Sequence, residues 1–176
     1  SVLPPTLAEE FESATHGIVL STYGGADFGG WSAADPSDPP IVRHATVGKP
    51  QDGTEFRIVD GDGLDVVLGK VGELIGRGPC CVSGYIGTEG SDRWKAGWFH
   101  TGDLAWIDES GHVVIVGRLK EVIVRGGDKV SPADVETVLR VHPGIEQVAI
   151  VGVPDPILGE RVCACIVPTR STQVPT

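Results

Sequence analysis

The sequence predicts an α+β fold, and three observations carry that prediction. Short apolar segments separated by glycine-rich turns recur about every eight to twelve residues between Glu55 and Val116, as in β-strands joined by tight connections. A serine-capped helix is expected to begin at Ser131, and two more apolar segments follow it. A further amphipathic pattern near the N-terminus adds a surface helix.

That N-terminal helix is expected over Leu3–Ala14, where apolar residues recur at helical spacing and glutamates occupy the other side. The apolar run Ile18–Leu20 then predicts a short buried strand that ends in a turn at Tyr23. Residues 32–53 are rich in Asp, Pro, Ser and Gly, so an irregular connection is expected there.

A small β-barrel or sandwich is expected over about residues 45–116. Its strands are predicted at Glu55–Val59, Val71–Ile75, Leu104–Ile107 and Val113–Val116, the last two joined by a turn that ends at Gly111.

A different unit begins after Gly117. Its helix is expected to start at Ser131, with a proline in the first turn, and to end before Pro143-Gly144. Two strands follow, near residues 147–153 and 162–168. With only about 55 residues this unit is small for an independent fold, so we expect a segment to be missing from its end.

Charge and composition limit the classes of function. The 176 residues carry 14 Lys and Arg against 24 Asp and Glu, a net charge of −10, which argues against nucleic-acid binding. No apolar run reaches the ~18 residues of a membrane span and no signal peptide is evident, so a cytoplasmic protein is expected. The sequence contains no Met, so Ser1 is not expected to be the natural start.

The four cysteines do not have the spacing of a zinc site. Cys80 and Cys81 are adjacent, and Cys163 and Cys165 alternate with apolar residues. Both thiols of the second pair are expected on one face of a strand, packed inward as small hydrophobes.

The motif Thr101-Gly102-Asp103, at the entry to a predicted strand, carries the most chemical information. A fixed carboxylate beside exposed backbone can accept both vicinal hydroxyls of a ribose. The alternative is a turn carboxylate that caps its own backbone. The segments Gly117-Arg118-Leu119-Lys120 and Arg125-Gly126-Gly127 follow, and the helix capped by Ser131 comes after them.

These segments resemble the adenylate-forming (AMP-binding) superfamily, in its acyl-CoA synthetase branch. The resemblance covers almost the whole chain, and any single piece of it would be weak. The matching elements occur in family order and comprise Tyr23-Gly24-Gly25, Gly72-Glu73-Leu74, Gly76-Arg77-Gly78-Pro79, Gly84-Tyr85, Thr101-Gly102-Asp103, Gly117-Arg118, Arg125-Gly126-Gly127, Val153-Pro154-Asp155 and Gly159-Glu160.

The resemblance implies a division of the chain and a reaction. Residues 1–116 would be the end of the large domain, 117–120 a hinge, and 121–176 the first part of a small α+β lid. The family converts a carboxylic acid and ATP to an acyl-adenylate, releasing pyrophosphate. After the lid rotates, the thiol of coenzyme A attacks the adenylate and AMP leaves.

Site residues follow from the same resemblance. Asp103 would hold the ribose hydroxyls with help from Arg118, although Arg118 could instead pair with a nearby carboxylate. Tyr23 would lie along adenine, while Gly24 and Gly25 would let the nucleotide approach the backbone.

The lid side of the site is implied in the same way. Lys120 matches the hinge position, with a solvated strand-end lysine as the alternative. Gly126 and Gly127 match the loop that lines the coenzyme A tunnel.

This chain departs from the family at four points. Ala26 and Asp27 stand where many members have Thr-Glu, so Asp27 is the magnesium candidate and Ala26 offers no hydroxyl to phosphate. The family's phosphate loop and its terminal catalytic lysine are both absent, which implies a fragment that is inactive alone.

Two other functions stay open, namely an adenylation enzyme that loads a carrier-protein pantetheine, and a noncatalytic nucleotide-binding module. The acid itself is not predicted. Phe28 and Trp31 hint at an aromatic or medium aliphatic acid, but core packing explains them equally well.

Overall fold

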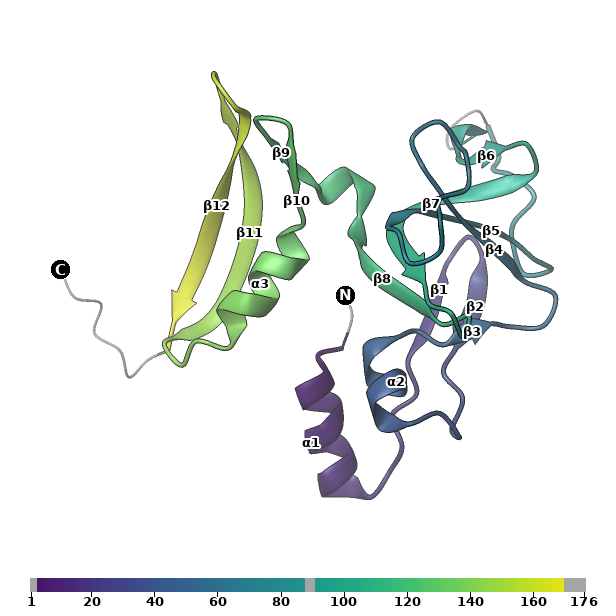
Figure 1. Ribbon diagram of the computed structural model, residues 1–176, viewed down its shortest axis with the longest axis horizontal. Helices are drawn as coiled ribbons and strands as arrows, with labels where there is room; N and C mark the ends of the chain where they lie inside the picture. The colour runs from purple at the N-terminus through teal and green to yellow at the C-terminus, as the bar shows by residue number, and fades with distance from the viewer. Residues whose placement is uncertain (1–2, 88–90, 170–176) are drawn as a thin grey trace. The chain divides into compact units, whose positions relative to one another are not determined.

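The computed structural model describes residues 3–87 and 91–169. They form two compact units, Ser1–Ile115 and Val116–Thr176, and each is described by itself (Figure 1). None of the described helices is long and apolar enough to cross a membrane.

The described residues of the first unit form two helices, a single 3₁₀ turn and two antiparallel sheets. The helices are α1 (Pro5–Thr15) and α2 (Pro40–Ala45), and the 3₁₀ turn is η1 (Ser91–Arg93). The smaller sheet has the strand order β1-β2-β3, with bounds Thr22–Gly25, Gly29–Ala33 and Lys49–Pro50. The larger sheet has the order β4-β5-β7-β6, and β8 also pairs with β7. Its strands are β4 (Glu55–Val59), β5 (Gly72–Arg77), β6 (Trp94–Lys95), β7 (Trp98–Ile107) and β8 (Val113–Arg118). The unit boundary falls within β8, whose residues from Val116 to Arg118 belong to the second unit.

The predicted strands between Glu55 and Val116 are present, but the predicted closed barrel is not. The pairing path of the larger sheet starts at β4 and runs through β5 to β7, and among the described residues no pairing returns to β4 to close it. A closed barrel needs a continuous ring in which each strand pairs with two others. Here β7 pairs with three strands, β5, β6 and β8, along its ten residues. The sheet is therefore open.

An aromatic cluster forms the core of the first unit. Trp31 and Phe99 are fully buried, and Phe28 packs between them with ring centroids 4.2 and 5.6 Å away. A Cβ at Gly76 of β5 would lie 2.4 Å from the Trp31 ring, so the indole requires a glycine beneath it. Because β2 contributes Trp31 and β7 contributes Phe99, this cluster holds the two sheets together.

A partly buried ion pair joins α1 to α2. Arg43 lies 2.6 Å from Glu12 and also donates to the Val19 carbonyl. His44 Nε2 lies 3.2 Å from the same Glu12 carboxylate, although its alignment is too poor for a hydrogen bond. The hydrogen bond from Arg43, followed by that from the Val19 amide, lowers the pKa of Glu12 from 4.5 to about 2.

Two local predictions in this region are wrong. Ile18–Leu20 is not a strand, and the side chains of Ile18 and Leu20 are exposed. The segment has no strand partner, because the Val19 amide donates to Glu12 of α1 and the Val19 carbonyl accepts from Arg43 of α2. Residues 32–53 are not wholly irregular, since α2 begins at a pair of prolines that fit a helical first turn.

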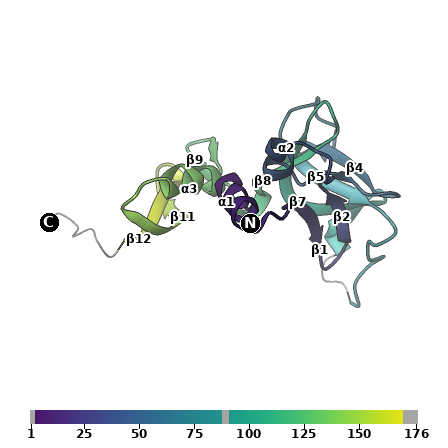
Figure 2. The ribbon, with the colours of Figure 1, turned by 90° about the horizontal axis from the view of Figure 1, so that it is seen from below.

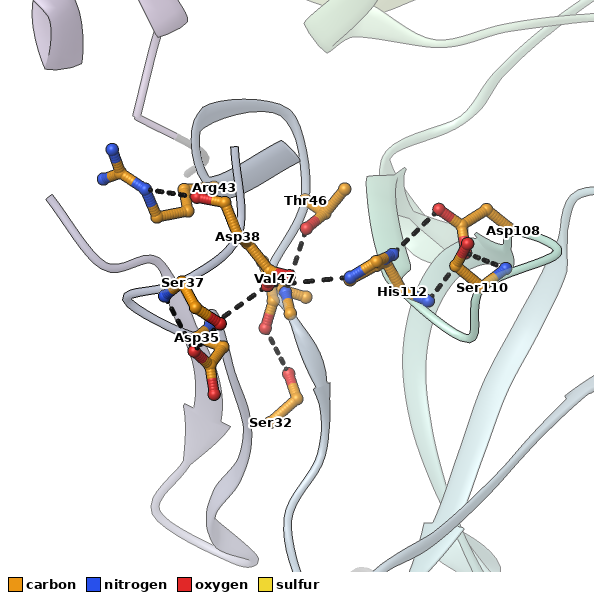
Figure 3. A network of polar contacts seen from close by, with 11 residues as sticks. Ser32, Asp35, Ser37, Asp38, Arg43, Thr46, Val47, Asp108, Ser110 and His112 are labelled. Atoms are coloured by element: carbon orange, nitrogen blue, oxygen red, sulfur yellow. Dashed lines mark hydrogen bonds and ion pairs between the residues drawn. The ribbon is translucent and has the colours of Figure 1, made fainter. Parts of the chain in front are cut away.

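A polar network fixes the connection between β2 and β3 against the β7–β8 turn (Figure 3). His112 is buried, with Nδ1 3.0 Å from Asp108 and Nε2 3.6 Å from Asp38. Burial alone would raise the pKa of Asp108, but hydrogen bonds from the backbone and ring of His112 lower it. Ser32 donates to the Val47 carbonyl at 2.7 Å, which extends the network into β2.

The second unit is a sheet covered on one face by a single helix. Its strand order is β10-β9-β12-β11. Helix α3 packs on β11, as Figures 1 and 2 show. The elements are η2 (Leu119–Glu121), β9 (Ile123–Arg125), β10 (Asp128–Val130), α3 (Pro132–Arg140), β11 (Ile145–Asp155) and β12 (Gly159–Pro168). The predicted N-cap is confirmed, since the Ser131 hydroxyl accepts from the Asp134 amide.

The cysteines of β12 do not pack inward as predicted. The buried face of the sheet carries Val148 and Ile150, which alternate with Ala149 and Val151 on the other face. Cys165 pairs with Ala149 and Cys163 with Val151, so both thiols share the face opposite the core, and Cys165 is exposed. Alternation placed both thiols together but did not tell which face was buried.

The ion pair between α1 and α2 generates a pH-dependent prediction. Because the pKa of Glu12 is lowered on folding, its stabilisation is complete above 4.5 and is lost as the pH falls through about 2. Glu12→Gln should therefore lower the urea midpoint of the first unit at pH 7, and the gap from wild type should narrow as the pH falls from about 5 towards 2. Tryptophan fluorescence reports this unit alone, because all four tryptophans, Trp31, Trp94, Trp98 and Trp106, lie in it.

The matched control is Glu10→Gln, an exposed glutamate on the same helix. It should change the midpoint little at any pH. A gap for Glu12→Gln that stays constant from pH 7 to acid would contradict the linkage.

Candidate functional site

Asp103 lies on an irregularity in the pairing of β5 with β7. Glu73 pairs with Leu104 and Ile75 pairs with His100, so Leu74 alone faces Thr101, Gly102 and Asp103. The two extra residues on β7 form a bulge, and Gly102 there has φ +73°, where glycine meets no steric penalty. The bulge turns Asp103 into the unit, where it is only 7% exposed.

Hydrogen bonds fix this bulge at its first and last residues. The Thr101 hydroxyl donates to the Leu74 carbonyl at 2.6 Å and accepts from the Asp103 amide at 3.0 Å. The Gly102 amide donates to Glu73 at 3.1 Å. The backbone that carries the Asp103 carboxylate is therefore held by side chains where the strand ladder is interrupted.

The Tyr23 hydroxyl donates to Asp103 at 2.6 Å across 80 residues of sequence. Tyr23 is on β1, and its ring packs against Phe28 in the aromatic cluster. A short bond from a neutral hydroxyl to a buried carboxylate is of the stronger, charge-assisted kind. The smaller sheet thereby positions a carboxylate that belongs to the larger one.

The turn between β1 and β2, which follows Tyr23, is closely packed. A Cβ at Gly24 would lie 2.2 Å from the Gly29 carbonyl oxygen, and one at Gly25 would lie 2.9 Å from the Phe28 ring. Both positions therefore exclude a side chain.

Asp27 lies in the same turn and is half-buried. Burial, with hydrogen bonding to Asp27 next in size, raises the pKa of the Tyr85 hydroxyl. Burial and the Asp27 charge also raise the pKa of the Cys81 thiol. Within residues 3–87 and 91–169, no three His, Cys, Asp or Glu side chains gather to hold a metal ion. Asp27 thus suits a hard cation only as one ligand beside others.

The remaining predicted residues belong to the start of the second unit. Arg118 ends β8 and Lys120 lies in η2, and both are exposed. Gly126 and Gly127 form the two-residue turn between β9 and β10, with φ +59° and +97°, a geometry that favours glycine at both positions. The Gly126 amide donates to the Leu158 carbonyl at 2.8 Å, so the turn is fixed to the β11–β12 connection.

The structure thus brings Tyr23 and Asp103 together in the first unit, and it places Arg118, Lys120 and the pair Gly126-Gly127 in the second. Sequence reasoning missed Glu73 and Thr101 as supports of Asp103. The sequence showed only that Glu73 and Thr101 belong to motifs. The strand register that brings them together cannot be read from neighbouring residues.

A buried carboxylate that accepts from a tyrosine hydroxyl can also accept hydrogen bonds from the hydroxyl groups of a small polar ligand. The AMP-binding enzyme family model matches residues 1–86, and the model of the AMP-binding enzyme C-terminal domain matches residues 134–176. The chain belongs to this AMP-binding enzyme family, and the α+β fold expected from the sequence, with mixed helices and strands, is confirmed.

Relatives and solved structures agree with that assignment. A probable CoA ligase of Humulus lupulus is 36% identical over 176 residues, which is 98% of this chain and 33% of the relative. The salicyl-AMP ligase/salicyl-S-ArCP synthetase of Mycobacterium tuberculosis is 40% identical over 134 residues, which is 74% of this chain and 24% of that protein.

ATP-bound MatB from Rhodopseudomonas palustris superimposes with a TM-score of 0.91 at 28% identity, covering 99% of this chain and 35% of that structure. The chain therefore spans about a third of the length of the relatives it matches over nearly all of its residues.

The hydrogen bond between Tyr23 and Asp103 generates the second prediction. Tyr23→Phe removes a donor from a buried carboxylate and should destabilise the first unit by about 1.5–3 kcal/mol in urea unfolding followed by tryptophan fluorescence. Tyr85→Phe, at the more exposed tyrosine, is the matched control and should cost about 1 kcal/mol or less. If the two variants lose the same free energy of unfolding, the hydrogen bond to Asp103 stabilises the unit no more than that of an exposed tyrosine.

Proposed function

We propose that this chain forms the ribose-binding and lid portions of an AMP-forming acid–thiol ligase, an acyl-CoA synthetase. The observation that carries the proposal is the Asp103 carboxylate, fixed by the Tyr23 hydroxyl and by the bulge of β7. Support comes from family membership, from CoA ligases among the relatives and from the likeness to ATP-bound MatB.

In the first half-reaction the acid's carboxylate oxygen attacks the α-phosphorus of ATP, and pyrophosphate leaves with the electron pair of the broken P–O bond. Asp103 would accept hydrogen bonds from the ribose hydroxyls and so hold the nucleotide in register for that attack. Tyr23 would fix Asp103 and border the adenine. Gly24 and Gly25 would keep the neighbouring turn closed, since their Cβ positions face the Gly29 carbonyl and the Phe28 ring. Arg118 would assist at the ribose.

Asp27 is the residue that would hold magnesium. A single carboxylate is enough when substrate phosphates and water supply the other oxygen ligands, which is how magnesium is commonly bound. The ion would neutralise phosphate charge.

In the second half-reaction the thiol of coenzyme A attacks the acyl carbon of the adenylate, a thioester forms, and AMP leaves. Lys120, in the short turn η2, is the proposed hinge on which residues 121–176 rotate. Gly126 and Gly127 would then line the tunnel for the pantetheine arm, where an absent side chain leaves room for a thin substrate.

A second acceptor is supported by one relative. The mycobacterial protein is a salicyl-S-ArCP synthetase, and it is 40% identical over 134 residues of this chain. A carrier-protein pantetheine would use the same thiol chemistry. A noncatalytic nucleotide-binding module, the third candidate, would keep Asp103 and Arg118 without any turnover.

The acid is not identified by the aromatic residues considered for it. Phe28 and Trp31 both lie in the hydrophobic cluster with little or no exposure, which supports their interpretation as core. Their hint of an aromatic or medium aliphatic acid therefore loses its basis.

Nucleotide binding tests the role of Asp103. AMP titrated into the 176-residue chain and followed by NMR should bind about tenfold or more tightly than 2′,3′-dideoxy-AMP, because hydrogen bonds to a charged group are worth about 1.5–3 kcal/mol. Asp103→Asn should remove most of that preference. Equal affinity of the wild-type chain for the two nucleotides would overturn the ribose assignment.

Carboxylate-dependent ATP–pyrophosphate exchange tests the ligase. The chain alone should give no exchange with fatty or aryl acids and magnesium, since the phosphate loop and terminal lysine expected of the family are absent from it. The same residues placed in the corresponding third of a CoA ligase relative should restore it. Exchange by the chain alone would refute the proposed division of labour, and a chimera that binds AMP without exchange would favour the noncatalytic module.

A further inference from the structure

Glu73 of β5 contacts one residue inside the bulge of β7, Gly102, and one residue just before the bulge, His100. Its Oε1 accepts from the Gly102 amide at 3.1 Å, and its Oε2 lies 2.8 Å from His100 Nδ1. Its side chain is 16% exposed and that of His100 is 15% exposed, so both contacts are mostly shielded from water. Since a carboxylate oxygen accepts hydrogen bonds, the tautomer of His100 with a proton on Nδ1 can donate to it.

The contact between Glu73 and Gly102 supplies a hydrogen-bond partner that the bulge would otherwise lack. Extra residues in a bulge lose regular ladder hydrogen bonds, yet their amides still need partners when they are shielded from water. Here the Gly102 amide uses Glu73 and the Asp103 amide uses the Thr101 hydroxyl. Two consecutive peptide groups are thus fixed by side chains immediately before the Asp103 carboxylate.

We propose that Glu73 is a positioning residue for nucleotide binding, and that its two hydrogen bonds, to the Gly102 amide and to His100, fix the bulge that aims Asp103 at the ribose hydroxyls. This inference rests on the proposed role of Asp103. Glu73 itself does not touch the nucleotide. It acts through the Thr101–Gly102 peptide, whose N–H donates to its carboxylate.

Two substitutions of Glu73 distinguish a positioning role from a role of its negative charge. Glu73→Ala removes both acceptors. Glu73→Gln keeps an oxygen for the Gly102 amide and offers its amide group to His100, whose Nδ1 can accept in the other tautomer. Positioning therefore predicts that Gln rescues what Ala loses, whereas a role for the negative charge predicts that Gln and Ala fail alike.

The measurement is the ratio of the Kd for 2′,3′-dideoxy-AMP to the Kd for AMP, taken on the whole chain by NMR titration. The wild-type ratio should be about 10 or more, and Glu73→Ala should reduce it to about 1–2 while changing the Kd for the dideoxy nucleotide less than about twofold. Glu73→Gln should keep the ratio within about threefold of wild type. The control is Glu10→Ala, an exposed glutamate on α1, which should leave the ratio unchanged.

Each outcome has one meaning. A wild-type ratio near 1, or no effect of Asp103→Asn, refutes the ribose assignment itself. A normal ratio in Glu73→Ala, an equal loss for both nucleotides, or a Gln variant as poor as Ala refutes the positioning role alone. If Glu73→Ala loses the wild-type amide spectrum, Glu73→Asp decides by the same ratio. Its shorter side chain cannot hold both contacts, so an intermediate ratio supports positioning and an unchanged ratio overturns it.

Discussion

The candidate site depends on one hydrogen bond, from the Tyr23 hydroxyl to the Asp103 carboxylate. A carboxylate that is 7% exposed is costly unless it is hydrogen-bonded, so Asp103 needs donors wherever the fold places it. Tyr23 supplies one from a different sheet, and the ring that carries the hydroxyl is fixed by Phe28 and the aromatic cluster. The core of the first unit therefore also orients the site, because the packing that buries the tyrosine ring sets the direction of the carboxylate.

Local signals predicted the elements well where the chemistry that forms them is local. The Ser131 cap, the helix after it and the strands from Glu55 onward depend on residues within a few positions of one another. Prediction failed where a tertiary partner decides. Ile18–Leu20 has the composition of a buried strand, but no strand lies beside it in the described structure. Cys163 and Cys165 alternate as predicted, yet α3 covers the other face.

The site was predictable to the same extent. Thr101-Gly102-Asp103 could be found by composition and resemblance, because the motif is contiguous. Its support by Glu73 could not, since that contact requires β5 and β7 to pair with two extra residues on one strand only. Nothing near Glu73 in sequence indicates that register. The motif in this chain therefore contains the carboxylate proposed to contact a ligand, while the side chains that hold its backbone are found only when the two strands are paired.

The charge distribution fits the proposed division of work between the units. The chain has a net charge of −10, which is unfavourable for a nucleotide or for coenzyme A, since both are anions. A ribose, however, is neutral and donates hydrogen bonds, so an acidic unit can bind it through a carboxylate without help from the overall field. The anionic parts of the ligands need cations instead, and three basic residues lie close together in sequence at Lys120, Arg125 and Lys129. On the proposed function, the first unit would recognise the sugar by hydrogen bonding while the start of the second supplies positive charge, so salt should weaken the second contribution far more than the first.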